Sequence, residues 1–87
     1  MNLFADEKFK KAHRMVAERA SGYCVDQSKA SATFVWEMWL VGKTFVLVTA
    51  RHNKALRETH VEVWAPITDS NAWEDTELAL EIIKAKA

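Results

Sequence analysis

The sequence contains little glycine, proline or cysteine, and its formal net charge is zero. Two of its 87 residues are glycine, one is proline and one is cysteine. So few glycines and prolines exclude collagen-like, linker-like and low-complexity architectures. The lone Cys24 has no second cysteine with which to form an internal disulfide. The chain is therefore not a disulfide-stapled secreted scaffold.

Long hydrophobic runs are also absent. The longest nearly uncharged run, residues 30–41, contains Glu37 and is far shorter than the roughly 20 residues that span a bilayer. Residues 1–11 have no apolar stretch of the kind found in a signal peptide. We therefore expect a cytoplasmic protein that does not enter a membrane.

The composition that remains is that of an ordinary globular domain. Hydrophobic residues make up 49 % of the chain and charged residues 28 %, which is too apolar for a disordered tail. A chain of this length has room for one domain. Residues 1–87 are therefore expected to form a single small domain.

Two segments have the periodicity of amphipathic helices. Residues 6–20 place their apolar side chains at spacings of three and four, which puts them on one stripe. Residues 72–86 repeat this pattern, and Asn71 followed by Glu74 is a capping pattern. Both segments are predicted to be helices that cover an apolar layer.

Three segments have the character of strands. Residues 33–41 and 44–49 are rich in β-branched and aromatic side chains. Gly42-Lys43 between them suits a two-residue type II′ turn, which pairs Leu40 with Phe45 and Trp39 with Val46. The polar residues 51–59 are expected to be a connection. Residues 59–65 alternate again as a third strand, and residues 23–25 are a candidate short edge strand.

The predicted fold class is α+β, in the order α-β-β-β-α. We expect two layers, in which an antiparallel three-stranded meander, with a possible extra edge strand, has both helices packed on one face. This order resembles double-stranded-RNA-binding domains in layout. That family opens its second helix with lysines, whereas this chain has the acidic sequence Asn-Ala-Trp-Glu-Asp at residues 71–75. Duplex binding depends on basic side chains, so the resemblance implies no nucleic-acid partner.

Both sides of the predicted hairpin are apolar. We expect one side to form the core beneath the helices, namely Phe34, Trp36, Met38, Leu40, Phe45 and Leu47. The other side is then uncovered, and its predicted interface residues are Val35, Trp39, Val41, Val46, Val48 and Trp64. An antiparallel sheet normally alternates apolar and polar residues. Because two helices cover only one face, something else should cover the second one.

Three explanations of what covers the second face are compatible with the sequence. Residues 24–32 could fold over the second face within the monomer, or a homodimer could form through it, because a two-fold assembly needs only a self-complementary patch. A different protein partner or a small ligand is the third option. The leading hypothesis is a non-catalytic interaction module that self-associates or binds a protein through this face.

The alternative hypothesis is a small-ligand-binding protein or a minor enzyme that uses a pocket on the same face. Its polar groups would be Glu37, His60 and Glu62, because a carboxylate beside an imidazole can act as a general base. A third hypothesis is nucleic-acid binding through the basic cluster of Arg51, Lys54 and Arg57. The sequence has no phosphate-loop, zinc or nucleophile-elbow motif, so no cofactor and no metal are expected.

Overall fold

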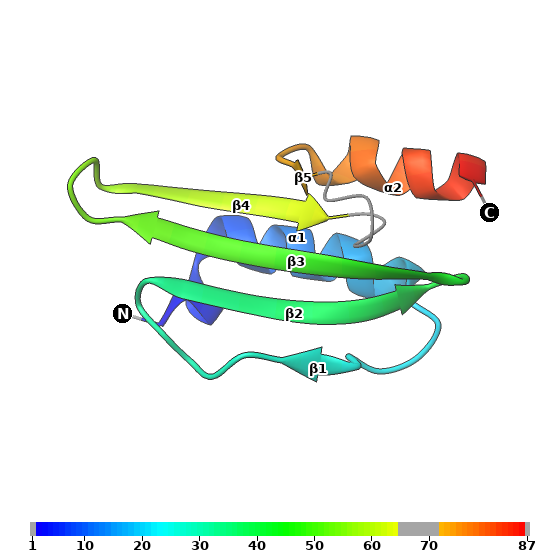
Figure 1. The fold of residues 1–87 in the computed structure, drawn as a ribbon, viewed down its shortest axis with the longest axis horizontal. Helices are drawn as coiled ribbons and strands as arrows, with labels where there is room; N and C mark the ends of the chain where they lie inside the picture. Colours follow the sequence, from blue (N-terminus) through cyan, green and yellow to red (C-terminus); the bar gives the residue numbers. More distant parts are fainter. Residues whose placement is uncertain (1, 65–71, 87) are drawn as a thin grey trace.

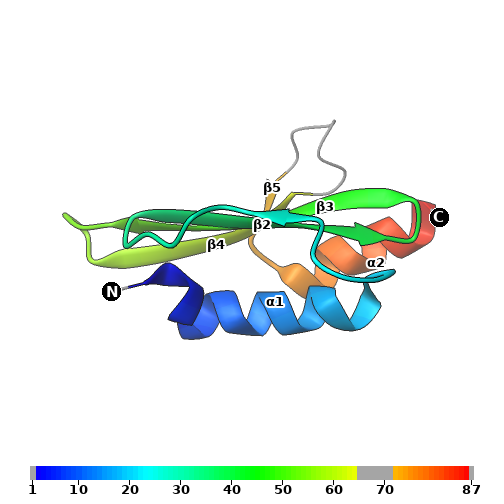
Figure 2. The same cartoon turned by 90° about the horizontal axis from the view of Figure 1, so that it is seen from below.

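The computed structural model describes residues 2–64 and 72–86. Its five strands form one antiparallel sheet in the order β1-β2-β3-β4-β5. Figure 1 shows the sheet, and Figure 2 shows both long helices on one side of it. The predicted two-layer α+β fold is confirmed. The elements are η1 (Leu3–Ala5), α1 (Glu7–Arg19), β1 (Asp26–Gln27), β2 (Phe34–Val41), β3 (Thr44–Asn53), β4 (Glu58–Trp64), β5 (Ala72–Trp73) and α2 (Thr76–Lys86).

The hairpin of β2 and β3 has the predicted register. Leu40 pairs with Phe45 and Trp39 pairs with Val46, on either side of the turn. Gly42 has a φ of +62°, whereas Lys43, the second central residue of the turn, is not among the residues with a positive φ. A positive φ at the first central residue alone is the signature of a type II′ turn, which glycine adopts without strain.

The next hairpin is longer than the sequence suggested. Residues 51–59, predicted as a connection, are mostly strand, because β3 continues to Asn53 and β4 begins at Glu58. The Asn53 side chain accepts hydrogen bonds from the backbone amides of Ala55 (3.0 Å) and Leu56 (3.2 Å). These bonds close a tight turn, so the polar composition of this segment marks exposed strand ends rather than a loop.

The two edge strands are short. The predicted edge strand at residues 23–25 forms instead at Asp26–Gln27. At the other edge Trp73 pairs with Val63 of β4. The second helix therefore begins at Thr76 rather than at the predicted residue 72. Asp75 begins that helix, since its carboxylate accepts from the Leu78 amide at 3.1 Å. Asn71, the predicted cap, lies outside the described residues, as does Ala65, the last residue of the predicted third strand.

Helix α1 packs its apolar stripe onto the sheet. Asp6 begins the helix by accepting hydrogen bonds from the amides of Lys8 (2.9 Å) and Phe9 (3.2 Å), as an N-cap does. The stripe is buried against one side of β2, β3 and β4, and Leu3 of η1 closes its end. The buried core comprises Leu3, Phe9, Ala12, Val16, Val35, Trp39, Val46, Val48, Ala50, Val63, Ala79 and Leu80.

The predicted assignment of the two hairpin sides is wrong. Helix α1 covers the side that carries Glu37, and the expected core side faces away from both helices. Of the predicted interface residues, Val35, Trp39, Val46 and Val48 are at most 7 % exposed, and Val41 packs against the same core. Trp64 alone lies on the uncovered side. The physical reason is that small valines fit closely beneath α1, and that the helix supplies a polar partner for Glu37.

Candidate functional site

The side of the sheet that faces away from the helices is apolar and partly exposed. We call it the open face, and no helix in the described part of the chain covers it (Figure 2). Phe34 and Phe45 at its two ends are each 48 % exposed, and the rest are half-buried. The open face consists of Phe34, Trp36, Met38, Leu40, Phe45, Leu47 and Trp64.

Polar groups on the open face lie at one side and are paired within the chain. The Trp64 Nε1 donates to the Thr49 hydroxyl at 3.3 Å, so the indole nitrogen already has a partner within the chain. Further along, Arg51 and Glu62 form an ion pair with 3.9 Å between nitrogen and oxygen. The open face therefore has an apolar centre and, on its rim at one side, one pair of opposite charges.

A buried carboxylate lies on the opposite side of the sheet, beneath α1. Glu37 is 3 % exposed, and His13 Nδ1 lies 2.7 Å from its Oε1 and 2.9 Å from its Oε2. Trp39 Nε1 donates to Oε1 at 2.8 Å. Because the carboxylate has two side-chain donors, its burial is compensated by hydrogen bonds. His13, which the sequence did not connect with Glu37, fixes α1 against β2.

The proposed pocket of Glu37, His60 and Glu62 does not assemble. Glu37 pairs with Val48 on the side beneath α1, whereas Glu62 pairs with Thr49 on the open side. His60 lies at the border of the sheet, where its ring is 3.4 Å from Glu58 and 3.7 Å from Glu74. The sheet separates Glu37 from Glu62. His60 lies on the same side of β4 as Glu62 by strand alternation, but its ring contacts Glu58 and Glu74 instead, so the three predicted residues share no site.

The basic residues predicted as a nucleic-acid-binding cluster are divided between a strand and a turn. Arg51 lies in β3 on the rim of the open face, whereas Lys54 and Arg57 lie in the turn that follows.

Neither a metal site nor a membrane-spanning helix is found in the described part of the chain. Within residues 2–64 and 72–86, no group of three or more metal-ligating side chains converges. No helix in these same ranges is both long and apolar enough to cross a membrane.

Cys24 lies between β1 and β2 and has a weakly acidic thiol. Its Sγ donates to the carbonyl of Asp26 at 3.1 Å and to that of Met38 at 3.5 Å. Burial raises the pKa of Cys24, and the negative charge of Glu37 raises it further. The thiolate is the reactive form, so the folded protein should resist alkylation.

We predict that the alkylation of Cys24 by iodoacetamide is slower in the native protein than in the urea-unfolded chain at the same pH. The substitution Glu37→Gln removes a negative charge that raises the pKa of Cys24, so the midpoint of the rate-against-pH curve should move to lower pH. Glu62→Gln, on the other side of the sheet, serves as the control. A midpoint that does not move in Glu37→Gln contradicts the assigned role of this carboxylate.

Comparisons with known proteins give no relative for this chain. No protein-family model, no curated protein and no solved structure matches it. Any proposal about its function therefore depends on the geometry described above.

Proposed function

We propose that this protein is a non-catalytic, cytoplasmic interaction module that forms a homodimer through its open face. The observation that supports this proposal is an apolar sheet face with two half-exposed phenylalanines and two tryptophans, opposite a separate and complete core. The single cysteine fits a reducing compartment, because the chain needs no disulfide.

The size of the open face suits a small dimer interface. Strand β2 has eight residues, which at about 3.3 Å each make the face roughly 26 Å long. Its residues come from three strands, β2, β3 and β4, which at about 4.8 Å apart make it roughly 14 Å wide, so its outline covers roughly 370 Å². Side-chain relief adds to this area, which stays below the roughly 800 Å² that each partner buries in a standard interface and therefore predicts a weak dimer.

A second copy of the chain is the partner that the charges favour. The chain has twelve basic and twelve acidic residues, so two copies do not repel each other overall. Both Arg51 and Glu62 lie on the rim, and in a two-fold assembly each can meet the opposite charge of the other copy. The centre is apolar and can pack against itself, as the inner faces of a β-sandwich do.

The β1 edge of the sheet is a less suitable route to association. The amide of Gln27 in β1 donates to the Asp26 carboxylate at 2.8 Å. This local bond occupies a backbone donor that an added strand would need, and a negative charge stands beside it. Such features protect edge strands from pairing with other chains, which leaves the open face as the favoured surface.

Sedimentation equilibrium from micromolar to millimolar concentration tests the proposal. We expect the mass to rise with concentration towards twice the 9.9 kDa of the chain. Tryptophan fluorescence should shift to shorter wavelength over the same range, because Trp36 and Trp64 lose water on association. A mass that stays at that of one chain throughout overturns self-association.

A further inference from the structure

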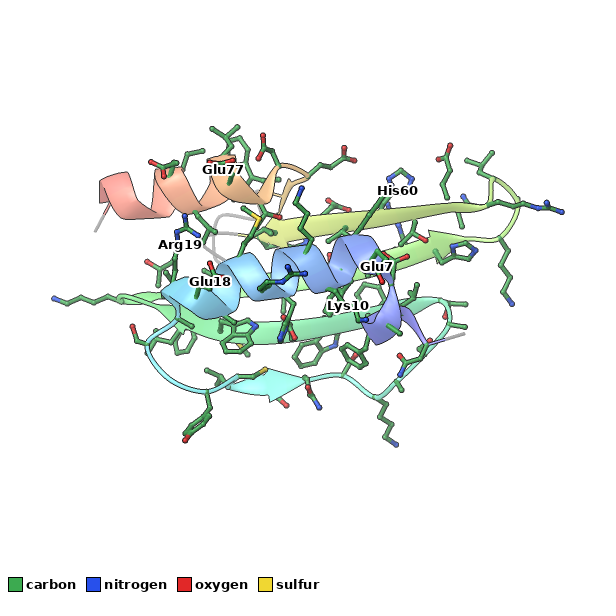
Figure 3. All side chains as sticks on the ribbon, turned by 180° about the vertical axis from the view of Figure 1, so that it is seen from behind. Glu7, Lys10, Glu18, Arg19, His60 and Glu77 are labelled. Carbon is green, nitrogen blue, oxygen red and sulfur yellow. The ribbon has the colours of Figure 1, made fainter. Side chains whose placement is uncertain are left out.

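A cleft on the helix side of the molecule carries an inference that does not depend on the open face. It has a volume of about 390 Å³ and lies between α1, β4 and the start of α2. Its apolar lining comes from Ala12, Met15 and Val61. Figure 3 shows His60 on β4 and Glu77 on α2, on the same side of α1. The volume is near the lower end for ligand pockets, so it suits a small molecule.

The two long walls of this cleft carry opposite charges. Lys8 and Lys11 line it from α1, three residues apart and hence on one face of the helix, and Glu74 and Glu77 line it from the opposite side. Within residues 2–64 and 72–86, no ion pair of 4.0 Å or less joins these walls. The charges therefore face a space between them rather than each other.

The acidic residues of the cleft differ in how far they are already engaged. Asp75 caps α2 through the Leu78 amide, and Glu74 lies 3.7 Å from His60. Glu77 has no such contact among the described residues, although it lies in the first turn of the helix. It is the carboxylate that a cationic group in the cleft can approach without displacing another partner.

We propose that this cleft binds a zwitterionic α-amino acid with an apolar side chain. The carboxylate of the ligand lies against Lys8 and Lys11, and its ammonium group lies against Glu77. The ligand side chain packs on Met15 and Val61. A simple anion or cation is attracted by one wall and repelled by the other, whereas a ligand with both charges is attracted by both walls and matches the cleft best.

Isothermal titration calorimetry with L-methionine, N-acetylmethionine and methionine methyl ester tests the proposal. The free amino acid should bind, and each blocked derivative should bind at least about ten-fold more weakly, because each lacks one charge that the walls recognise. The variants Lys8→Gln/Lys11→Gln and Glu77→Gln should each weaken methionine binding by at least about ten-fold. Lys10→Gln is the matched control, since Lys10 pairs with Glu7 at 3.9 Å on the other side of α1 (Figure 3).

Three outcomes overturn the proposal. One is the absence of saturable binding of L-methionine and L-leucine by the wild-type protein at millimolar ligand. Another is equal binding of the blocked derivatives. The third is that the charge variants lose stability, that the charge-swapped variant Lys11→Glu/Glu77→Lys regains it, and that none of these proteins binds a ligand. The lysines and glutamates would then only pair with each other across the cleft. The open-face variant Leu47→Glu should bind methionine like the wild type, so a failure of dimerisation is distinguishable from a failure of this cleft.

Discussion

Replacing Leu47 by glutamate is expected to convert the dimer into a folded monomer. Leu47 lies at the centre of the open face, where it is paired with Met38 on one side and Trp64 on the other. In a two-fold interface the substitution places two carboxylates in the buried centre, and each lacks a partner. We expect the dimer dissociation constant to rise at least about a hundred-fold, which corresponds to about 2.8 kcal/mol.

The matched control for this substitution is Leu56→Glu. Leu56 is 63 % exposed and lies in the turn between β3 and β4, away from the open face. This variant carries the same change of side chain and charge, and it should sediment like the wild type. A Leu47→Glu variant that remains dimeric would contradict the open face as the interface. An unchanged far-ultraviolet circular dichroism spectrum establishes that the monomer is folded.

The hairpin of β2 and β3 could be predicted from the sequence because its signals are local. Gly42 fixes the turn, and the turn fixes which residues face each other on the two strands. The second hairpin was predicted less well, because Arg51, His52 and Asn53 are polar residues at an exposed strand end. Their strand conformation depends on pairing with residues 58–60, which composition does not reveal.

Which side of the sheet the helices cover could not be predicted from the sequence. Both sides are apolar, and the side of Phe34, Trp36 and Met38 has enough apolar side chains for a full core, so the sequence argument places it beneath the helices. The structure buries the Glu37 carboxylate with a donor from α1, His13, which is 24 residues away in the chain. A polar pair of this separation has no local signature. A histidine on the border of an apolar helix stripe, opposite an unpaired acid in an apolar strand, was the signal available.

The same inversion limited the prediction of the candidate site. An apolar surface with tryptophans was expected, and such a surface exists, but only Trp64 of the predicted residues lies on it. Trp36, placed in the core by the sequence argument, faces outward instead. The cleft beside α1 was not predicted, because it combines residues of α1, β4 and α2 whose proximity follows only from the packing of the helices.

Replacing Trp39 by alanine should greatly lower the free energy of unfolding without changing any side chain of the open face. Trp39 is 7 % exposed, donates to Glu37 and contacts the His13 ring edge to face at 5.5 Å between centroids. Truncation of a buried tryptophan costs about 3–5 kcal/mol, a large part of the roughly 5–15 kcal/mol that stabilises a domain. Urea denaturation followed by circular dichroism measures this loss.

Trp36→Ala is the matched comparison, because Trp36 lies on the same strand with its side chain on the open face. Both substitutions should be made in the Leu47→Glu background, so that dimerisation does not add to the measured stability. There we expect Trp36→Ala to cost about 1 kcal/mol, since a half-buried side chain loses only part of its apolar burial. Returned to the wild-type background, Trp36→Ala should weaken the dimer. Equal losses of stability for the two tryptophans would mean that the open face is as well packed within one chain as the core beneath α1, and would remove the physical reason for a partner.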